Sequence, residues 1–304
     1  MSNLEPSAEA NCECLTGCGA IEFILKPKDR DLGGFSVRRL LPNREVRHIG
    51  PWVFFDHMGP ADFEPGTGID VRPHPHINIA TVTYLFEGSI LHKDSLGSIQ
   101  VIRPGDINLM VAGRGIVHSE RETKDVRNSQ HRTNGLQLWL ALPEDDEEID
   151  PSFHHYSTGS IPTVEVDAVP VRVMMGEAYG VESPVKTFSS TLYIEAKMTA
   201  GQRLVLPNAE QRGLYLVSGS VKLLDTVVET HSMVVLKTEP NVCVEALEET
   251  QIALIGGSDI GQRHIDWNFV SSRPERIEQA IQDWKAGKFK PISTDNREYI
   301  PYPG

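Results

Sequence analysis

The feature that most constrains the fold of this chain is a succession of short β-prone segments separated by turn signals. In the first half such segments are expected at 35–40, 52–55, 79–86, 98–102, 107–111 and 136–142. Proline and glycine stand between them, as in Arg103-Pro-Gly-Asp106 and Ala112-Gly-Arg-Gly115. Many short strands at this spacing indicate an antiparallel sandwich or barrel. The alternation of strands and helices that a doubly wound fold requires is missing, so we predict an all-β fold.

A second β-rich block covers residues 161–255, with strands expected at 171–175, 191–197, 214–217, 220–224, 232–236 and 251–255. A short repeat relates the two blocks, because Tyr84-Leu-Phe-Glu-Gly-Ser-Ile90 resembles Tyr215-Leu-Val-Ser-Gly-Ser-Val221. Both stretches are typical of a strand, a glycine turn and a second strand. A chain of 304 residues has room for about two domains, so the repeat favours a duplicated β domain.

An acidic run, Glu144-Asp-Asp-Glu-Glu148, lies near the middle of the chain. Like charges this close repel one another, so a solvated linker is expected, and a cation or partner site is the alternative. The domain order predicted from these features is an N-terminal tail (1–20), a first β domain (21–143), the acidic linker (144–152), a second β domain (153–258), and a C-terminal helix and tail (259–304).

One helix is predicted close to the C-terminus. Ser272-Arg-Pro-Glu275 resembles a capping box with proline in the first turn. Apolar residues then recur at the i, i+3, i+4, i+7 spacing of a helix, at Ile277, Ala280, Ile281 and Trp284. Gly287 follows as a stop signal. The pattern indicates an amphipathic helix that packs on a barrel and has a structural role.

Two motifs stand apart from the other histidines, most of which are isolated. His74-Pro-His76 precedes a β segment, and His118-Ser-Glu120 follows the glycine turn at 113–115. Residues two apart in a strand point to the same face, so each pair can direct both side chains inward. One such pair arises by chance, as the neighbours His154 and His155 illustrate. Two facing strands, however, would join three imidazoles and a carboxylate, a set that suits Fe(II), Ni, Co, Cu or Zn better than Mg or Ca.

Three of the four cysteines lie close together, at Cys12, Cys14 and Cys18, and the fourth is Cys243. A structural zinc site usually has four ligands at CxxC-like spacing, and no fourth ligand follows nearby. Reduced surface thiols are therefore expected, with a metal clip as the alternative.

The chain has 29 Lys and Arg against 42 Asp and Glu, a formal charge of −13. It has no basic run and no overall attraction for nucleic acid or for an anionic membrane. No stretch of about 18 apolar residues occurs, so no transmembrane helix is expected. Residues 1–9 have neither the basic nor the apolar region of a signal peptide, which indicates a cytoplasmic protein.

Taken together, the motifs resemble the cupin barrel and, more closely, the pirin family of double cupins. The stretches that carry the resemblance are Gly33–Arg39, Pro51–Met58 with Phe54-Phe55-Asp56, His74-Pro-His76, Thr81–Gly88, His92–Gly97, Pro104-Gly-Asp106, Ala112–Glu120 and Gly135–Leu140. In the second half the resemblance is carried by the overall layout and by Thr191-Leu-Tyr193. It implies two tandem cupin barrels (double-stranded β-helices, or jelly rolls) followed by a C-terminal helix.

The resemblance also implies a metal site. In pirins only the N-terminal barrel binds metal, and the ligands that its motifs carry over are His74, His76, His118 and Glu120. The implied cofactor is one divalent ion per chain, most often Fe(II), with Ni, Co, Cu, Mn or Zn as the other candidates. The stretch before Tyr215 has no histidine, so no metal is expected in the C-terminal barrel.

One position departs from the broader cupin motif, which has a Glu four residues after the second histidine. Here that position is Ala80, so the carboxylate ligand would be Glu120. If the strand alternates regularly through Asn78, Ala80 faces the same way as His76 and leaves space for an organic ligand. Candidates for lining this cavity are Phe55, His57, Met110 and Trp139, although packing alone is the expected role of each.

The resemblance implies more than one class of function. Some bacterial pirins are quercetin 2,3-dioxygenases. In such an enzyme a flavonol would lose its hydroxyl proton to Glu120 and then react with O2, with loss of CO. The animal member is described as an iron-dependent transcription coregulator, so the alternative is a metal-dependent regulator that acts through a protein partner. A cupin enzyme for another small molecule is the third hypothesis.

Overall fold

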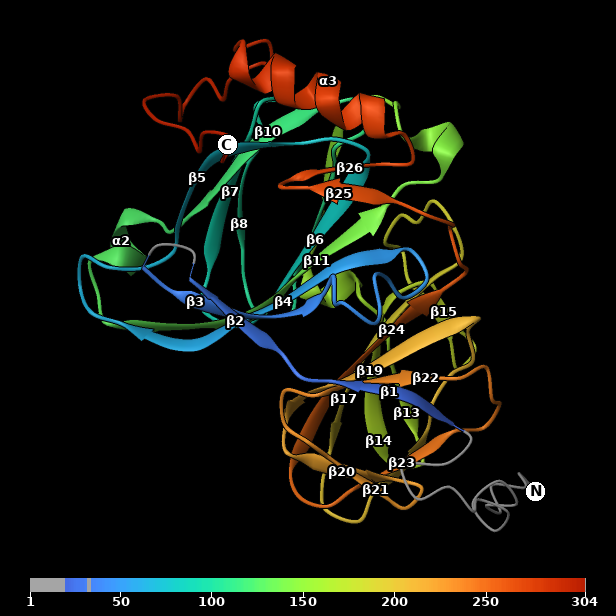
Figure 1. The fold of residues 1–304 in the computed structure, drawn as a ribbon. Coiled ribbons are helices and arrows are strands. Elements are labelled where there is room, and N and C mark those ends of the chain that lie inside the picture. The colour runs from blue at the N-terminus through green and yellow to red at the C-terminus, as the bar shows by residue number, and fades with distance from the viewer. Residues whose placement is uncertain (1–19, 32–33, 304) are drawn as a thin grey trace. The chain divides into compact units, whose positions relative to one another are not determined.

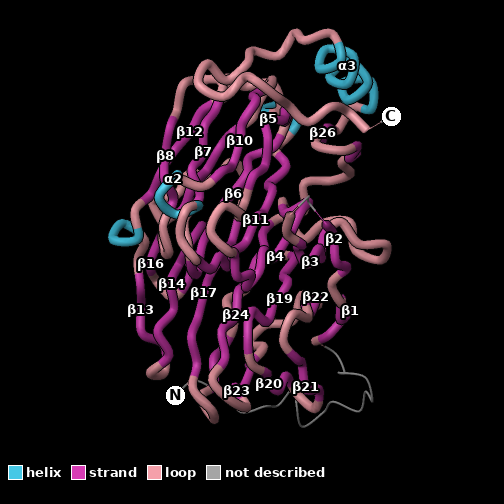
Figure 2. Tube along the Cα trace, turned by 90° about the vertical axis from the view of Figure 1, so that its left-hand side faces the viewer, coloured by secondary structure: helices cyan, strands magenta, loops and turns pink. Residues whose placement is uncertain are grey.

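The structure is a computed structural model that describes residues 20–31 and 34–303 (Figure 1). Cys12, Cys14 and Cys18 lie outside the described residues, so their predicted role is not addressed. Strands dominate the described chain, and helical turns are few (Figure 2). The chain divides into two compact units, each built on a seven-stranded and a four-stranded sheet. The prediction of a mostly β chain with two β domains is therefore confirmed.

The first barrel consists of the described residues within 29–41, 53–158 and 260–304. Its sheets have the strand orders β12-β9-β6-β11-β4-β3-β2 and β5-β10-β7-β8. The strands are β2 (Lys28–Asp31), β3 (Ser36–Leu41), β4 (Trp52–Phe63), β5 (Asp70–His76), β6 (Ile79–Glu87), β7 (Ile90–Asp94), β8 (Ile99–Ile102), β9 (Ile107–Val111), β10 (Ile116–Arg121), β11 (His131–Ala141) and β12 (Ser152–Tyr156). A short helix, α2 (Lys124–Arg127), joins β10 to β11.

The second barrel consists of residues 20–28, 42–52 and 159–259. Its sheets have the orders β1-β22-β19-β24-β17-β14-β13 and β18-β23-β20-β21. The strands are β1 (Ile21–Leu25), β13 (Thr163–Val166), β14 (Val169–Met175), β17 (Thr191–Met198), β18 (Arg203–Val205), β19 (Gln211–Ser218), β20 (Ser220–Leu223), β21 (Thr226–Glu229), β22 (Met233–Leu236), β23 (Cys243–Ala246) and β24 (Thr250–Gly257), with the small pair β15 (Glu177–Ala178) and β16 (Val181–Glu182) beside them.

The internal repeat seen in the sequence marks equivalent strands of the two barrels. Tyr84 lies in β6 and Tyr215 in β19, which occupy the same place in their sheets. The glycines that follow, Gly88 and Gly219, have positive φ of 85° and 75°. A Cβ atom would lie 2.7 Å from a backbone oxygen at Gly88 and 2.4 Å from one at Gly219. A side chain would clash in both turns, so both positions require glycine. This shared requirement explains why the repeat can be recognised in the sequence.

Two segments join a different barrel from their sequence neighbours. β1 pairs with β22 of the second barrel. Within the same unit, the Trp52 indole donates a hydrogen bond of 3.0 Å to the Gly256 carbonyl. The compact units therefore differ from the consecutive ranges 21–143 and 153–258 expected from the sequence. The reason is that edge strands choose partners by hydrogen bonding along a sheet edge, which hydrophobic periodicity does not encode.

The acidic run differs from the solvated linker that its charge predicts. Glu144 and Asp145 are exposed, but Glu147 is buried. Its carboxylate accepts hydrogen bonds from the Ser271 hydroxyl (2.9 Å) and the Ser272 backbone N–H (2.7 Å). The Arg263 guanidinium lies 3.3 Å away and is equally buried. Glu147 is thus the anchor of the C-terminal segment on the first barrel, and its burial is offset by a cation and several donors.

We expect Glu147→Ala to lower the free energy of unfolding by about 3–5 kcal/mol, because Arg263 would lose its buried partner and keep only the exposed Glu144 carboxylate, 4.0 Å away. Urea denaturation followed by tryptophan fluorescence measures this loss. Asp145→Asn, on the exposed side of the same run, is the matched control and should change stability by less than about 0.5 kcal/mol. Equal stability of the two variants would show that the buried pair contributes nothing.

The predicted C-terminal helix is α3 (Pro274–Lys285). It buries Ile277 and Ala280 in a cluster with Phe269 of β26 (Phe269–Ser271), which pairs with β25 (His264–Asp266). The predicted capping box does not form, because Ser272 bonds Glu147 and the helix begins after Arg273. Gly287, with φ of 67°, follows the helix as expected. Among the described residues, no helix is both long and apolar enough to cross a membrane.

Candidate metal centre

Three histidines of the first barrel meet at one point. His74 and His76 end β5, and His118 lies directly opposite His74 on β10. One ligand atom from each of the three side chains lies within 4.8 Å of the others. In the part of the chain that the structure describes, this is the one group of three or more His, Cys, Asp or Glu side chains that are close enough to share an ion. The three imidazoles of the predicted set therefore converge, whereas their role as metal ligands stays a prediction.

Burial keeps these imidazoles neutral. It lowers the pKa of His74 to about 4, and an adjacent carbonyl hydrogen bond offsets part of that effect. Burial, reinforced by repulsion from the neighbouring imidazoles, places the pKa values of His76 and His118 well below the usual range. A neutral imidazole offers a lone pair, which is the form that binds a metal ion.

Hydrogen bonds orient two of the rings. His74 Nδ1 lies 2.8 Å from the Arg72 carbonyl oxygen and His76 Nδ1 lies 3.0 Å from that of Asn268, so both Nδ1 atoms donate and Nε2 is left as the ligand atom. His118 differs, because neither of its buried ring nitrogens has a hydrogen-bond partner among the described residues. Buried polar atoms rarely stay unsatisfied. The three histidines therefore fit a divalent transition metal, which would satisfy one of the two ring nitrogens of His118.

Glu120 is placed beside the histidines but not among their close ligand atoms. It is 9% exposed and its Oε1 accepts a hydrogen bond of 3.2 Å from the Thr83 hydroxyl. A bulge in the pairing of β10 with β5 falls between His118 and Glu120, which shifts the carboxylate relative to the imidazoles. Burial raises the pKa of Glu120, although His92 and the Thr83 bond offset this in part. Such a carboxylate is a better proton acceptor than a solvated one.

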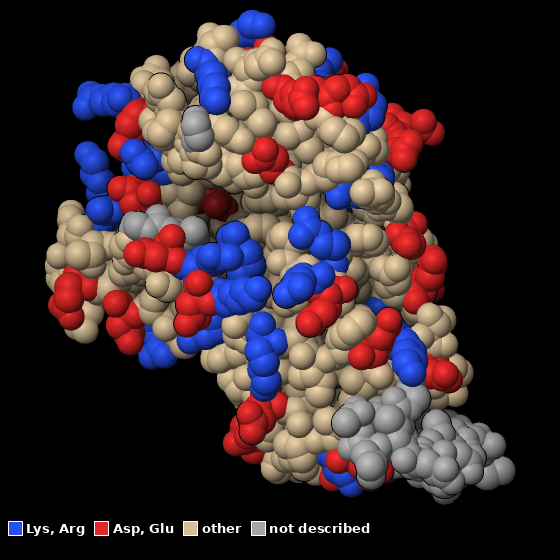
Figure 3. Space-filling model, in the orientation of Figure 1, with Lys and Arg blue, Asp and Glu red and all other residues tan. Residues whose placement is uncertain are grey.

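The histidines and Glu120 line one cavity of about 450 Å³. Figure 3 shows a hollow beneath the C-terminal helix, with acidic atoms deep inside it. Trp139 lines this cavity as predicted, whereas Phe55, His57 and Met110 do not. The His57 ring instead bonds the Asn134 side chain at 2.7 Å. A cavity of this size is typical of small-molecule sites.

One wall of the cavity is a stack of flat groups. The rings of Phe54 and Trp139 stack with centroids 3.9 Å apart, and the Arg39 guanidinium lies 4.3 Å from the Phe54 ring. The His76 ring meets Trp139 edge-on at 4.9 Å. Arg39 also makes two hydrogen bonds of 2.8 Å to the buried Asp56 carboxylate. Aromatic side chains therefore line the cavity beside the histidines, and a lining of this kind is typical of sites for small organic ligands.

The expected position of Ala80 is wrong. Asn78 has a positive φ of 57° and lies between β5 and β6, so the regular alternation assumed through it is broken. Ala80 pairs with Leu140, while Thr81 pairs with the cavity-lining Trp139. Cross-strand partners share a face, so Ala80 points away from the cavity. The space beside the histidines is therefore not due to the small side chain of Ala80.

Two parts of the site were missed from the sequence. His92 lies 3.1 Å from the Asp94 carboxylate, and its ring is 5.4 Å from that of His118. The i, i+2 spacing of His92 and Asp94 is the signal that could have identified this pair.

The second part that the sequence did not predict is the β25–β26 turn, which supplies the Asn268 carbonyl and Trp267. A backbone carbonyl has no sequence signature, so nothing could have predicted it.

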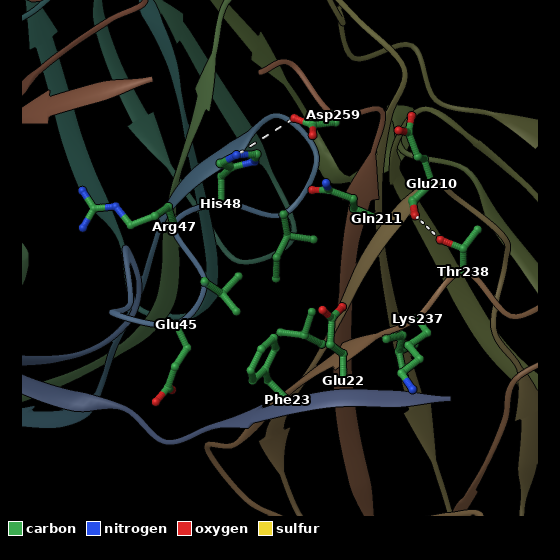
Figure 4. Close-up of a pocket in the computed structure, with 14 residues that line it drawn as sticks. Glu22, Phe23, Glu45, Arg47, His48, Glu210, Gln211, Lys237, Thr238 and Asp259 are labelled. Carbon is green, nitrogen blue, oxygen red and sulfur yellow. Dashed lines mark hydrogen bonds and ion pairs between the residues drawn. The ribbon is translucent and has the colours of Figure 1, made fainter. Parts of the chain in front are cut away.

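The interior of the second barrel is chemically different. β18 and β23 occupy the places of β5 and β10 in the sheet order, and they contribute Leu204 and Val244 to an aliphatic core. The absence of metal from this barrel stays a prediction. A depression of about 660 Å³ lies elsewhere in the unit and is lined by charged side chains of both signs (Figure 4). His48 and Asp259 are 4.0 Å apart at its edge.

Comparisons with known proteins agree with this geometry. The pirin family model matches residues 34–140, and that of the pirin C-terminal cupin domain matches residues 193–290. A pirin-like protein of Caulobacter vibrioides is 44% identical over 93% of this chain and 99% of its own length. Human pirin is 32% identical over 84% of this chain and 88% of its own. The crystal structure of a quercetin 2,3-dioxygenase from Acinetobacter baumannii has a TM-score of 0.86 and 32% identity, covering 93% of this chain and 95% of that one.

Proposed function

Because the chain belongs to the pirin family, whose two cupin domains its two barrels match, we propose that it is a metal-dependent dioxygenase that opens the ring of a flavonol such as quercetin. The observation that carries the proposal is the buried His118, whose ring nitrogens have no partner among the described residues and which meets His74 and His76 in a cavity with an aromatic wall. The likeness to a quercetin 2,3-dioxygenase supports the substrate class.

His74, His76 and His118 would hold one divalent ion, with Fe(II) as the first candidate and Glu120 as the fourth ligand or the base. When bound, the ion would supply Lewis acidity, which lowers the pKa of a hydroxyl group that it coordinates. The chain itself provides the rest. Because the imidazoles are neutral, their lone pairs are available to the ion. Phe54 and Trp139 line the space that the flat ring system would occupy.

Glu120 is the residue that would take up the proton of the flavonol 3-hydroxyl group. Its raised pKa and its place in the cavity favour this role. In the overall reaction both atoms of O2 enter the ring-opened ester, and one ring carbon leaves as CO, so no other oxidant is required. The proton on Glu120 returns to the product.

The test is anaerobic loading with Fe(II), followed by quercetin and O2. We expect O2 uptake and CO release in a one-to-one ratio. Luteolin, which is quercetin without the 3-hydroxyl group, is the matched control and should support neither. If no flavonol consumes O2 under any metal loading, the dioxygenase proposal fails, and a metal-dependent regulator that binds a protein partner takes its place. Turnover of an unrelated compound would indicate a different cupin enzyme.

A further inference from the structure

We propose that the first barrel has a second ligand site, for a small organic cation of the alkylammonium class, on the outer side of the strands that bear the histidines. The cavity there measures about 230 Å³, and its lining shares no described residue with that of the histidine cavity. Pro73 of β5, Val117 of β10 and parts of segment 284–299 form its walls. The proposal does not depend on the reaction proposed above.

Hydrogen bonds hold the walls of this cavity in place. The Trp284 indole donates a hydrogen bond of 3.1 Å to the Ile300 carbonyl, and the Ile300 N–H donates one of 2.8 Å to the Pro73 carbonyl. Between them, Asp295 accepts hydrogen bonds from Ser119 (2.8 Å) and Arg121 (2.7 Å). The segment after α3 is therefore tied to β5 and β10, and the cavity exists before any ligand arrives. Figure 1 shows this red segment beside the two strands.

Three aromatic residues line the cavity: Trp284, Phe289 and Tyr299. The Trp284 and Phe289 rings meet at 82° with centroids 5.7 Å apart, and the Trp284 and Tyr299 rings meet at 88° and 5.5 Å. Aromatic faces carry negative potential, and organic ammonium ions bind where several such faces meet. All three rings contribute to the wall of this cavity.

The charges around the cavity favour the same ligand. Asp295 and Glu298 belong to the lining, and Arg121 is shared by these two and by Asp70. Arg127 also lies 3.9 Å from Asp70, so three carboxylates share two arginines. Lys285, the cationic member of the lining, has its ammonium 4.6 Å from the ring centroid of Tyr302, which is not part of the lining. The chain as a whole has a formal charge of −13, so a cation is attracted and an anion repelled.

The size of the cavity restricts the ligand further. Drug-sized molecules occupy roughly 300–1,000 Å³, which is more than this cavity offers. A compact ammonium ion with a short apolar or hydroxylated chain fits it, whereas a flavonol does not.

The experiment compares choline with 3,3-dimethylbutan-1-ol, its neutral isostere, by ligand-observed NMR on the whole protein. We expect choline to bind with a dissociation constant on the order of millimolar and the alcohol to bind at least about ten-fold more weakly. Equal binding of the two probes, or no binding of choline, would overturn the proposal. Choline binding should be unchanged in His76→Ala with His118→Ala, and its loss there would place the ion in the histidine cavity instead.

Variants of exposed residues locate the site without disturbing the fold. Tyr299, which is 59% exposed, is changed to Leu to remove a ring and to Phe to keep it. Tyr299→Leu should weaken choline binding roughly 2- to 30-fold and Tyr299→Phe should not. Glu298→Gln should weaken it as well, whereas Glu275→Gln, on the first turn of α3, is the matched control. If all four variants bind choline as the unmodified chain does, the cavity assignment is wrong.

Discussion

We expect the double variant His76→Ala with His118→Ala to retain no divalent metal, whereas the unmodified chain holds about one ion. Two of three converging imidazoles are lost, and Glu120 with one histidine is too small a ligand set for tight binding. Metal analysis after loading with Fe(II) and desalting measures the ratio of ion to chain.

The matched control is His154→Ala, which removes a histidine of β12 outside the cluster and should leave the metal content unchanged. Metal retained by the double variant would mean that the three histidines are not the ligands. A ratio of two ions per unmodified chain would reveal a further site and contradict the prediction that the second barrel binds none.

We expect Glu120→Gln to lower kcat for quercetin by about 10²–10⁴-fold while part of the metal stays bound, because a general base typically contributes that much. The amide keeps the shape of the carboxylate and can still accept the hydrogen bond from Thr83, but it cannot take up a proton. Parallel measurements of O2 uptake and metal content separate the two roles. Glu87→Gln, at the end of β6 and outside the cavity lining, is the control.

Two results would contradict the assignment of Glu120 as base. Unchanged kcat would show that another group takes the proton, and the buried His92–Asp94 pair would be examined first. Complete loss of metal from Glu120→Gln would show that the carboxylate is chiefly a ligand.

The sequence predicted those features that depend on strand periodicity and on turns. The 107–111 segment coincides with β9, and the i, i+2 spacing placed His74, His76 and His118 on one inner face. Both results follow because a strand repeats every two residues. The repeat around Gly88 was visible because its turn admits no side chain.

The features that the sequence did not predict depend on contacts between distant segments. In the sequence, Glu147 is one of several neighbouring acidic residues. Its partners Arg263 and Ser271 are distant in sequence and contact it only in the folded chain. The face of Ala80 depends on the single left-handed residue Asn78, which interrupts the alternation. A local sequence pattern does not show which residue a charged side chain pairs with, and it does not show where a strand is interrupted.

The pairing of β1 with β22 bears on how this chain can be shortened. A fragment that starts at residue 153 would keep β22 but lose the strand that covers its edge. A bare edge is a template for a strand from another molecule. In the full chain this edge is covered in the register that joins Ile21 to Leu236 and Leu25 to Met233. A second fragment also lacks β1, so two free fragments would pair through their bare β22 edges. Edge-to-edge oligomers, rather than an isolated monomeric domain, are the form in which such a fragment would be recovered.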